Sequence, residues 1–121
     1  MKNQSFWTRF KYSLNGIRVA AFQEASFQTE SVLGLAAIVI FAWLRPPLIW
    51  IALCVLSAGT SLALELVNTA LERLADRLHP ENHLSIQIAK DCAAGAVTVA
   101  SFASAILGIL TVLVGLGWLK P

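Results

Sequence analysis

The sequence CAAGAVTVASFASAILGILTVLVGLGWL, residues 92–119, contains 28 consecutive residues without a charged side chain. A helix needs about 20 predominantly apolar residues to cross the hydrocarbon layer of a bilayer, so this stretch is long enough for one span. Over the whole chain of 121 residues the apolar fraction is 57% and the charged fraction is 13%. A soluble chain of this length could not cover so much apolar surface with so few charges. We predict an all-α membrane protein.

Two further apolar segments precede this stretch. Residues 31–44 are uncharged but number only 14, so their helix must begin earlier, near Phe22, with Glu24 and Glu30 at the membrane edge. The sequence Arg45-Pro46-Pro47 ends that helix in a tight turn. The next 19 uncharged residues, 46–64, supply another span. The sequence thus predicts a single domain, residues 1–121, with helices that contain the three spans at about 22–44, 47–78 and 85–119.

The pattern of residues 5–20 predicts an amphipathic helix that lies on the membrane surface. Its apolar side chains share one face, and basic side chains border that face, which is typical of helices in the headgroup layer. The alternative is a helix packed on the protein's own core. The apolar face consists of Phe6, Trp7, Phe10, Leu14 and Ile17.

The third span carries two rows of small residues, which let helix backbones approach closely in lipid. Two such faces indicate more than one neighbouring helix, so we expect a homo-oligomer. The first row is Ala89, Ala93, Ala96, Ala100 and Ala103, and the second is Ser101, Ser104, Gly108, Thr111 and Gly115.

The distribution of lysine and arginine predicts the orientation in the membrane. Seven of these residues lie on the side of the N-terminus and of the 73–90 segment, and two lie on the other side, so the N-terminus and the 73–90 loop should face the cytoplasm. The net charge of +2 is too small and too scattered to indicate a nucleic-acid partner. The seven residues are Lys2, Arg9, Lys11, Arg18, Arg73, Arg77 and Lys90, and the two are Arg45 and Lys120.

Glu65, Asn68, Glu72 and Asp76 form a polar stripe where the second span leaves the bilayer. Their spacing places the three carboxylates on one helix face. Carboxylates so placed repel one another and are costly to desolvate, which indicates a site that holds a cation or moves a proton. The topology brings this stripe to the same interface as Glu24 and the pair Lys90-Asp91.

These residue types suit phosphoryl transfer. Carboxylates bind Mg²⁺ together with substrate phosphates, Lys90 could contact phosphate oxygens, and a further carboxylate could accept a proton from an alcohol. The chain contains neither G-x-x-x-x-G-K-[ST] nor G-x-G-x-x-G. The residues alone therefore leave a kinase and a cation- or proton-conducting oligomer equally open. A third alternative is an interaction subunit in which the acids serve only assembly.

The segment ELVNTALE, residues 65–72, followed by Asp76 and by the sequence Ala89-Lys90-Asp91, resembles the small integral-membrane diacylglycerol kinases of bacteria. The resemblance extends upstream to residues 15–18 and 24–27 and covers roughly residues 8–100. It implies a homotrimer with shared active sites in the bacterial inner membrane, where the γ-phosphate of ATP is transferred to a lipid alcohol.

The resemblance also implies roles for individual residues. Glu65 would be the general base, and Glu24 and Glu72 would bind Mg²⁺ and, through it, ATP. Asn82 stands where the family commonly has an aromatic residue. The remaining catalytic residues would be Asn68, Asp76, Lys90 and Asp91, the last two also contacting ATP, and the nucleotide site would include Arg9, Tyr12, Glu81, Asn82 and His83.

The family divides by its lipid substrate. Residues 24–30, EASFQTE, are similar to the branch that phosphorylates diacylglycerol, whereas Asn68-Thr69-Ala70 and residues 90–97 are similar to the undecaprenol kinases. The first helix lies closer to the lipid entry in this family. We therefore expect phosphatidic acid as the product, with undecaprenol kinase as the alternative.

Overall fold

The structure is a computed structural model that describes residues 3–121, so Lys2, counted above among the basic residues, lies outside the described part. This part folds into α1 (Phe6–Gln23), α2 (Ala25–Leu44), α3 (Leu48–Leu78) and α4 (Leu84–Gly115). The last three are long and apolar enough to cross a membrane. The predicted fold class, an all-α protein with three membrane-spanning helices and an N-terminal helix, is confirmed.

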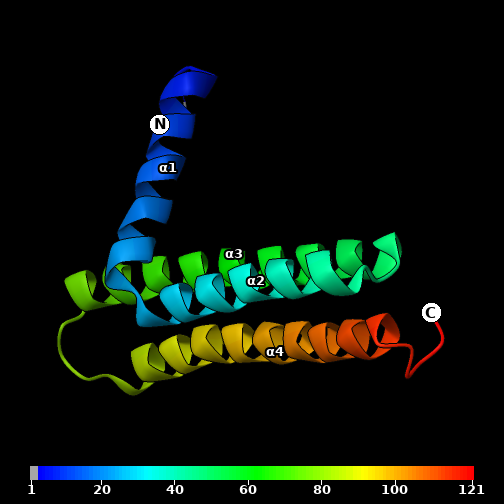
Figure 1. The fold of residues 1–121 in the computed structure, drawn as a ribbon. Coiled ribbons are helices and arrows are strands. Elements are labelled where there is room, and N and C mark those ends of the chain that lie inside the picture. Colours follow the sequence, from blue (N-terminus) through cyan, green and yellow to red (C-terminus); the bar gives the residue numbers. More distant parts are fainter. Residues whose placement is uncertain (1–2) are drawn as a thin grey trace.

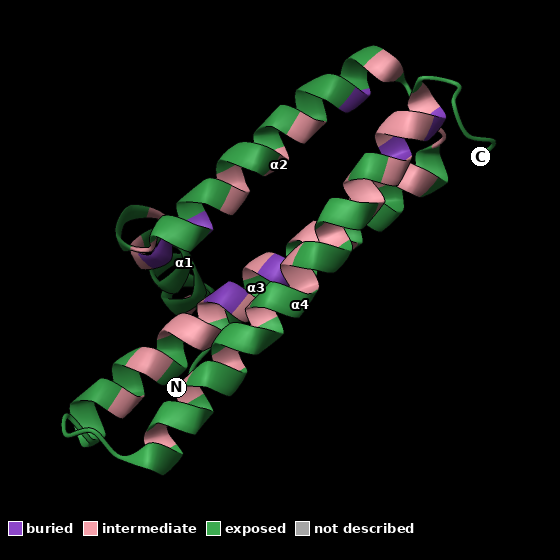
Figure 2. Cartoon of the chain, turned by 90° about the horizontal axis from the view of Figure 1, so that it is seen from below, coloured by how far each residue is buried: buried purple, intermediate pink, exposed green. Residues whose placement is uncertain are grey.

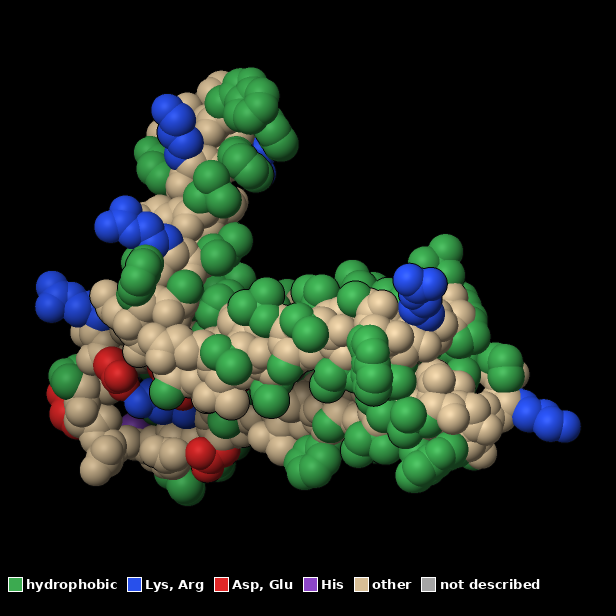
Figure 3. Space-filling model, viewed as in Figure 1, with side chains coloured by type: hydrophobic (Ala, Val, Ile, Leu, Met, Phe, Trp, Pro, Cys, Tyr) green, Lys and Arg blue, Asp and Glu red, His purple; other side chains and the backbone are tan. Residues whose placement is uncertain are grey.

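The three long helices run side by side, and α1 leaves their common axis at a steep angle (Figure 1). The chain passes along α2, returns along α3 and passes again along α4. The C-terminal end of α3 and the N-terminal ends of α2 and α4 therefore lie toward the same end of the bundle. Charged side chains of both signs gather there, whereas hydrophobic side chains predominate over the rest of the bundle on this face and the charged ones at its other end are basic (Figure 3).

Glu24 separates α1 from α2. Its backbone is extended, with φ −107° and ψ 113°, so it ends one helix and precedes the next. The first spanning helix was expected to begin near Phe22 with Glu24 inside it. Instead Phe22 and Gln23 continue α1, and the change of direction falls at Glu24. Ala20 and Phe27, on either side of this break, are both buried, so tertiary packing fixes the joint without a glycine or proline.

The apolar face of α1 is not covered by the other residues of the described part, 3–121. Phe6 and Trp7 are about 70% exposed and pack edge to face, with ring centroids 5.5 Å apart. Ala20 is the one buried residue of the helix. Packing on the chain's own core, the alternative for this helix, is therefore wrong for a single chain, and the aromatic face is free to enter a membrane surface.

Helices α2 and α4 both end at the end of the bundle opposite the one where charged side chains of both signs gather, and they end in different ways. Arg45 adopts a left-handed conformation with φ 51°, and the following Pro46 is buried. Helix α4 ends at Gly115, although the uncharged run continues to residue 119. Gly117, with φ 80°, turns the chain there, because a glycine adopts this conformation without steric cost.

The second row of small residues on α4 faces α2 and α3. Thr111 Oγ1 lies 3.1 Å from Cys54 Sγ, and Ser57 donates a hydrogen bond of 3.4 Å to Ser104. A Cβ atom added at Gly115 would lie 3.1 Å from the Cβ of Leu44, so the two helices approach closely here and a side chain at this position would press on Leu44. Buried positions are few, and all but Ala20 and Pro46 lie on α2, α3 and α4 (Figure 2).

Candidate active site

Glu65 is the centre of the charged end of the bundle. It is 5% exposed, and it lies on α3 one turn after the buried Ser61. The negative charges that act on it are those of Glu30, Glu24 and Glu72. Helices α2 and α3 and the joint at Glu24 thus bring four carboxylates together, of which Glu65 is buried. A group of this kind is electrostatically unfavourable unless a cation or a proton compensates it.

Asn68 lies beside Glu72 on the same helix. Its Nδ2 atom donates a hydrogen bond of 3.4 Å to Glu72 Oε1. Its Oδ1 atom is buried and has no hydrogen-bond partner among residues 3–121. A buried acceptor without a donor indicates a ligand, a water molecule or a partner group at that position. The amide oxygen and the adjacent carboxylate are both hard ligands, so this pair fits a cation such as Mg²⁺.

Glu24 contributes a third oxygen donor from the joint between α1 and α2. The described residues contain no cluster of three or more acidic, cysteine or histidine side chains with metal-site geometry. Mg²⁺ does not require such a cluster, since it typically takes one or two protein carboxylates and completes its shell with phosphates and water. Glu24 and Glu72 could therefore hold the ion and Asn68 could support it, with a bound nucleotide supplying further oxygens.

Lys90 links α4 to α3. Its ammonium group forms an ion pair with Asp76, and the next residue, Asp91, accepts a hydrogen bond of 2.9 Å from Gln87. The ion pair places the Lys90 cation next to the stripe on α3, whereas Asp91 bonds along its own helix. The packing of two antiparallel helices thus brings Lys90 to the stripe.

The loop between α3 and α4 carries the other predicted nucleotide residues. His83 is the N-cap of α4, and its Nδ1 atom accepts a hydrogen bond of 3.1 Å from the backbone N–H of Ser85. Glu81 lies 4.0 Å from His79. Asn82 and His83 line an open pocket of about 350 Å³ with residues of the first turn of α4.

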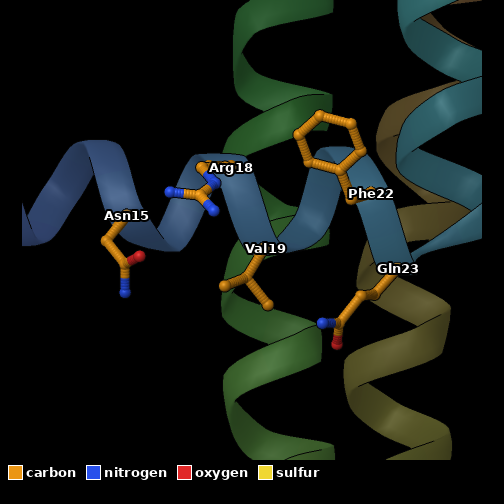
Figure 4. A pocket seen from close by; sticks show the side chains of 5 residues that line it. All are labelled: Asn15, Arg18, Val19, Phe22 and Gln23. Atoms are coloured by element: carbon orange, nitrogen blue, oxygen red, sulfur yellow. The ribbon is translucent and has the colours of Figure 1, made fainter.

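Arg9 and Tyr12 lie on the part of α1 that projects away from the bundle (Figure 1). Both side chains are exposed and make no side-chain hydrogen bond or ion pair with the other predicted site residues in the described part of the chain. A single chain therefore does not bring all predicted nucleotide residues together. A second pocket, of about 210 Å³, lies on α1 (Figure 4), lined by Asn15, Arg18, Val19, Phe22 and Gln23.

Glu30 belongs to the charged end, although the sequence assigned it only to the membrane edge. Ser61 donates a hydrogen bond of 2.6 Å to Glu30 Oε1, and Ser101 donates another to the same oxygen. Glu30 Oε2 is buried and has no partner among residues 3–121. The two serines lie 31 and 71 residues away in the chain. One sequence feature could have indicated this contact: Ser101 belongs to the second row of small residues, which was expected to face a neighbouring helix.

Removing both serine hydroxyls is expected to destabilise the protein. In the variant Ser61→Ala/Ser101→Ala the partly buried Glu30 carboxylate loses both of its donors. Hydrogen bonds to charged groups contribute about 1.5–3 kcal/mol each, and an unsatisfied buried charge costs more. We expect a loss of at least about 1.5 kcal/mol, measured as the free energy of unfolding in detergent micelles.

Ser57→Ala is the matched control, since Ser57 lies one turn away on the same face of α3 and its hydroxyl contacts only neutral groups. Its loss is expected to stay below about 1 kcal/mol, as for a neutral hydrogen bond between membrane helices. Equal losses in the two variants would contradict a special contribution of the Glu30 contact.

The sequence matches a family described as prokaryotic diacylglycerol kinase over residues 11–112. It is 36% identical to a diacylglycerol kinase of Synechocystis sp. over 100 residues, which is 82% of this chain and 57% of that protein. It is 37% identical to the diacylglycerol kinase of Escherichia coli K12 over 74% of this chain and 73% of the relative. The undecaprenol kinase of Bacillus subtilis is 32% identical over 87% of this chain and 85% of its own.

Proposed function

Because the chain belongs to the prokaryotic diacylglycerol kinase family, we propose that it transfers the γ-phosphate of ATP to diacylglycerol and produces phosphatidic acid. The observation that carries this proposal is the buried Glu65 beside Glu24, Glu30 and Glu72 at one end of a membrane-spanning bundle. A lipid alcohol approaches this end through the bilayer, and a nucleotide approaches it from water.

Each step of the reaction has a residue suited to it. Glu65 accepts the proton of the lipid hydroxyl, whose oxygen then forms a bond to the γ-phosphorus while the bond to the ADP oxygen breaks. Glu24 and Glu72 would hold a Mg²⁺ ion, which would supply positive charge to the phosphates, and Asn68 keeps Glu72 oriented. Lys90 and Asp91 orient the phosphates, and Asp76 supports Lys90 through their ion pair.

We also propose that the active site is shared between copies in a homotrimer. Arg9 and Tyr12 lie on the projecting α1, apart from Glu81 and His83 of the same chain (Figure 1). The first row of small residues on α4 remains available for a second copy, since Ala89, Ala96 and Ala103 are exposed. A neighbouring chain could therefore complete the nucleotide site.

The proposed location is the bacterial inner membrane, with the charged end of the bundle in the cytoplasm. Three helices long enough to span a membrane support the membrane location. The excess of lysine and arginine at the charged end supports the orientation.

Incubating the purified protein with labelled ATP, Mg²⁺ and mixed micelles of diacylglycerol or undecaprenol tests the proposal. We expect label in phosphatidic acid, at a higher rate than in undecaprenyl phosphate. The match to an undecaprenol kinase supports the reverse preference as the second candidate. Cation flux in liposomes without transfer to either lipid would instead establish a conducting oligomer, and loss of assembly on neutralising the acids without any transfer would establish an interaction subunit.

A further inference from the structure

Arg73 joins α3 to the joint between α1 and α2. It follows Glu72 directly in the sequence. Its Nη2 atom donates a hydrogen bond to Gln23 Oε1 and lies 3.7 Å from Glu24 Oε1. Gln23, at the end of α1, is one of the residues that line the pocket on that helix (Figure 4). The guanidinium group of Arg73 thus lies beside Glu24, one proposed Mg²⁺ ligand. The backbone of Arg73 directly follows that of Glu72, the other proposed ligand.

The positive charge of Arg73 compensates the cluster of carboxylates around Glu65 more directly than the charge of any other cation in residues 3–121. The ion pairs of this part of the chain join Lys90 to Asp76, His79 to Glu81, and Arg73 to Glu24. Only the last involves one of the four carboxylates around Glu65. A phosphate entering beside Glu24 would therefore meet this guanidinium group.

A purely structural role explains Arg73 poorly. Its side chain is 54% exposed, and exposed ion pairs contribute only about 0–1 kcal/mol to stability. Both contacts use Nη2, so Nη1 and Nε make no hydrogen bond within residues 3–121. The N–H groups of these two nitrogens can each donate a separate hydrogen bond to a phosphate oxygen.

We infer that Arg73 is a further phosphate-binding residue of the nucleotide site, acting on the triphosphate held at Glu24 and Glu72. The inference rests on the proposed function. It means that two basic side chains contact the phosphates, Arg73 from α3 and Lys90 from α4. Gln23 holds the guanidinium group at the joint through one nitrogen and leaves the other two for the ligand.

The test compares Arg73→Gln with Arg77→Gln. Arg77 lies one turn further along the same helix and forms no ion pair in the described part of the chain, so both variants lose the same charge. Binding of a non-hydrolysable ATP analogue with Mg²⁺ is measured by calorimetry, and binding of Mn²⁺ without nucleotide by electron paramagnetic resonance. We expect Arg73→Gln to weaken analogue binding about 10- to 100-fold, as for a lost charge-assisted hydrogen bond. Arg77→Gln should change it less than about threefold.

The Mn²⁺ measurement separates phosphate binding from positioning of Glu24. If Arg73 binds phosphate, its removal leaves Mn²⁺ affinity unchanged or higher, because a positive charge next to Glu24 has been lost. Equal weakening of Mn²⁺ and analogue binding would overturn the inference in favour of a positioning residue. Equal effects of Arg73→Gln and Arg77→Gln would overturn it as well. Failure of the unmodified protein to bind the analogue would overturn the proposed function, and the inference with it.

Discussion

Replacing Glu65 with glutamine is expected to lower phosphoryl transfer to lipid by about 10²–10⁴-fold, the usual contribution of a general base. Glutamine has nearly the same shape but cannot accept the proton of the alcohol. The variant should remain folded, because the substitution removes one negative charge from a group in which Glu24, Glu30 and Glu72 repel it. The initial rate of product formation is the measurement, at saturating ATP, Mg²⁺ and lipid.

A thermal unfolding experiment in the same micelles provides the control. We expect the Glu65→Gln protein to unfold at an unchanged or higher temperature, so the lost rate cannot be attributed to lost structure. Glu65→Asp keeps a carboxylate that is one methylene shorter and should retain more activity than the amide. A rate for Glu65→Gln within a few-fold of the unmodified protein would exclude Glu65 as the base.

Replacing Glu72 with glutamine is expected to raise the Mg²⁺ concentration for half-maximal rate by at least about tenfold. Loss of a residue that merely orients a metal ligand lowers metal affinity by about 10–100-fold. Loss of the ligand itself should lower the affinity by at least as much. Glu72 also accepts the hydrogen bond of Asn68, so the variant disturbs both oxygen donors of α3. The measurement is the rate as a function of Mg²⁺ concentration, together with direct Mn²⁺ binding.

Glu30→Gln is the matched control, because Glu30 belongs to the same group of four carboxylates but bonds to Ser61 and Ser101. It removes the same charge while keeping an acceptor oxygen for the two serines. If Glu72 binds the ion and Glu30 does not, only Glu72→Gln shifts the Mg²⁺ dependence. Equal shifts in the two variants would show that the ion responds to the total charge of the group, and Glu72 would lose its assignment as a ligand.

Most of the fold could be predicted from the sequence, because its main determinants are local. The uncharged stretches and the turn at Arg45-Pro46-Pro47 indicate where each helix crosses the membrane, and the structure has α2, α3 and α4 there. The spacing of Glu65, Glu72 and Asp76 likewise fixes a common helix face without any tertiary information.

The remaining features depend on contacts between distant segments. Glu24 ends α1 without a glycine or proline, so no local signal marks the joint. Glu30 could be recognised as more than a residue at the membrane edge only once the serines on α3 and α4 were placed beside it. The ion pair of Arg73 with Glu24 spans 49 positions, and in the sequence Arg73 counted only toward membrane orientation.

The row of hydroxyl and thiol contacts between α3 and α4 has a consequence for the way the two helices find their alignment. Lipid tails are as apolar as leucine side chains, so hydrophobic contacts alone let one helix slide along another at little cost. The contacts of Ser61 with Ser101, Ser57 with Ser104 and Cys54 with Thr111 form only in one alignment. A slip of one turn, about 5.4 Å, would break all three together. The row therefore fixes one alignment of the two helices, and with it the position of Glu65 on α3 relative to α4.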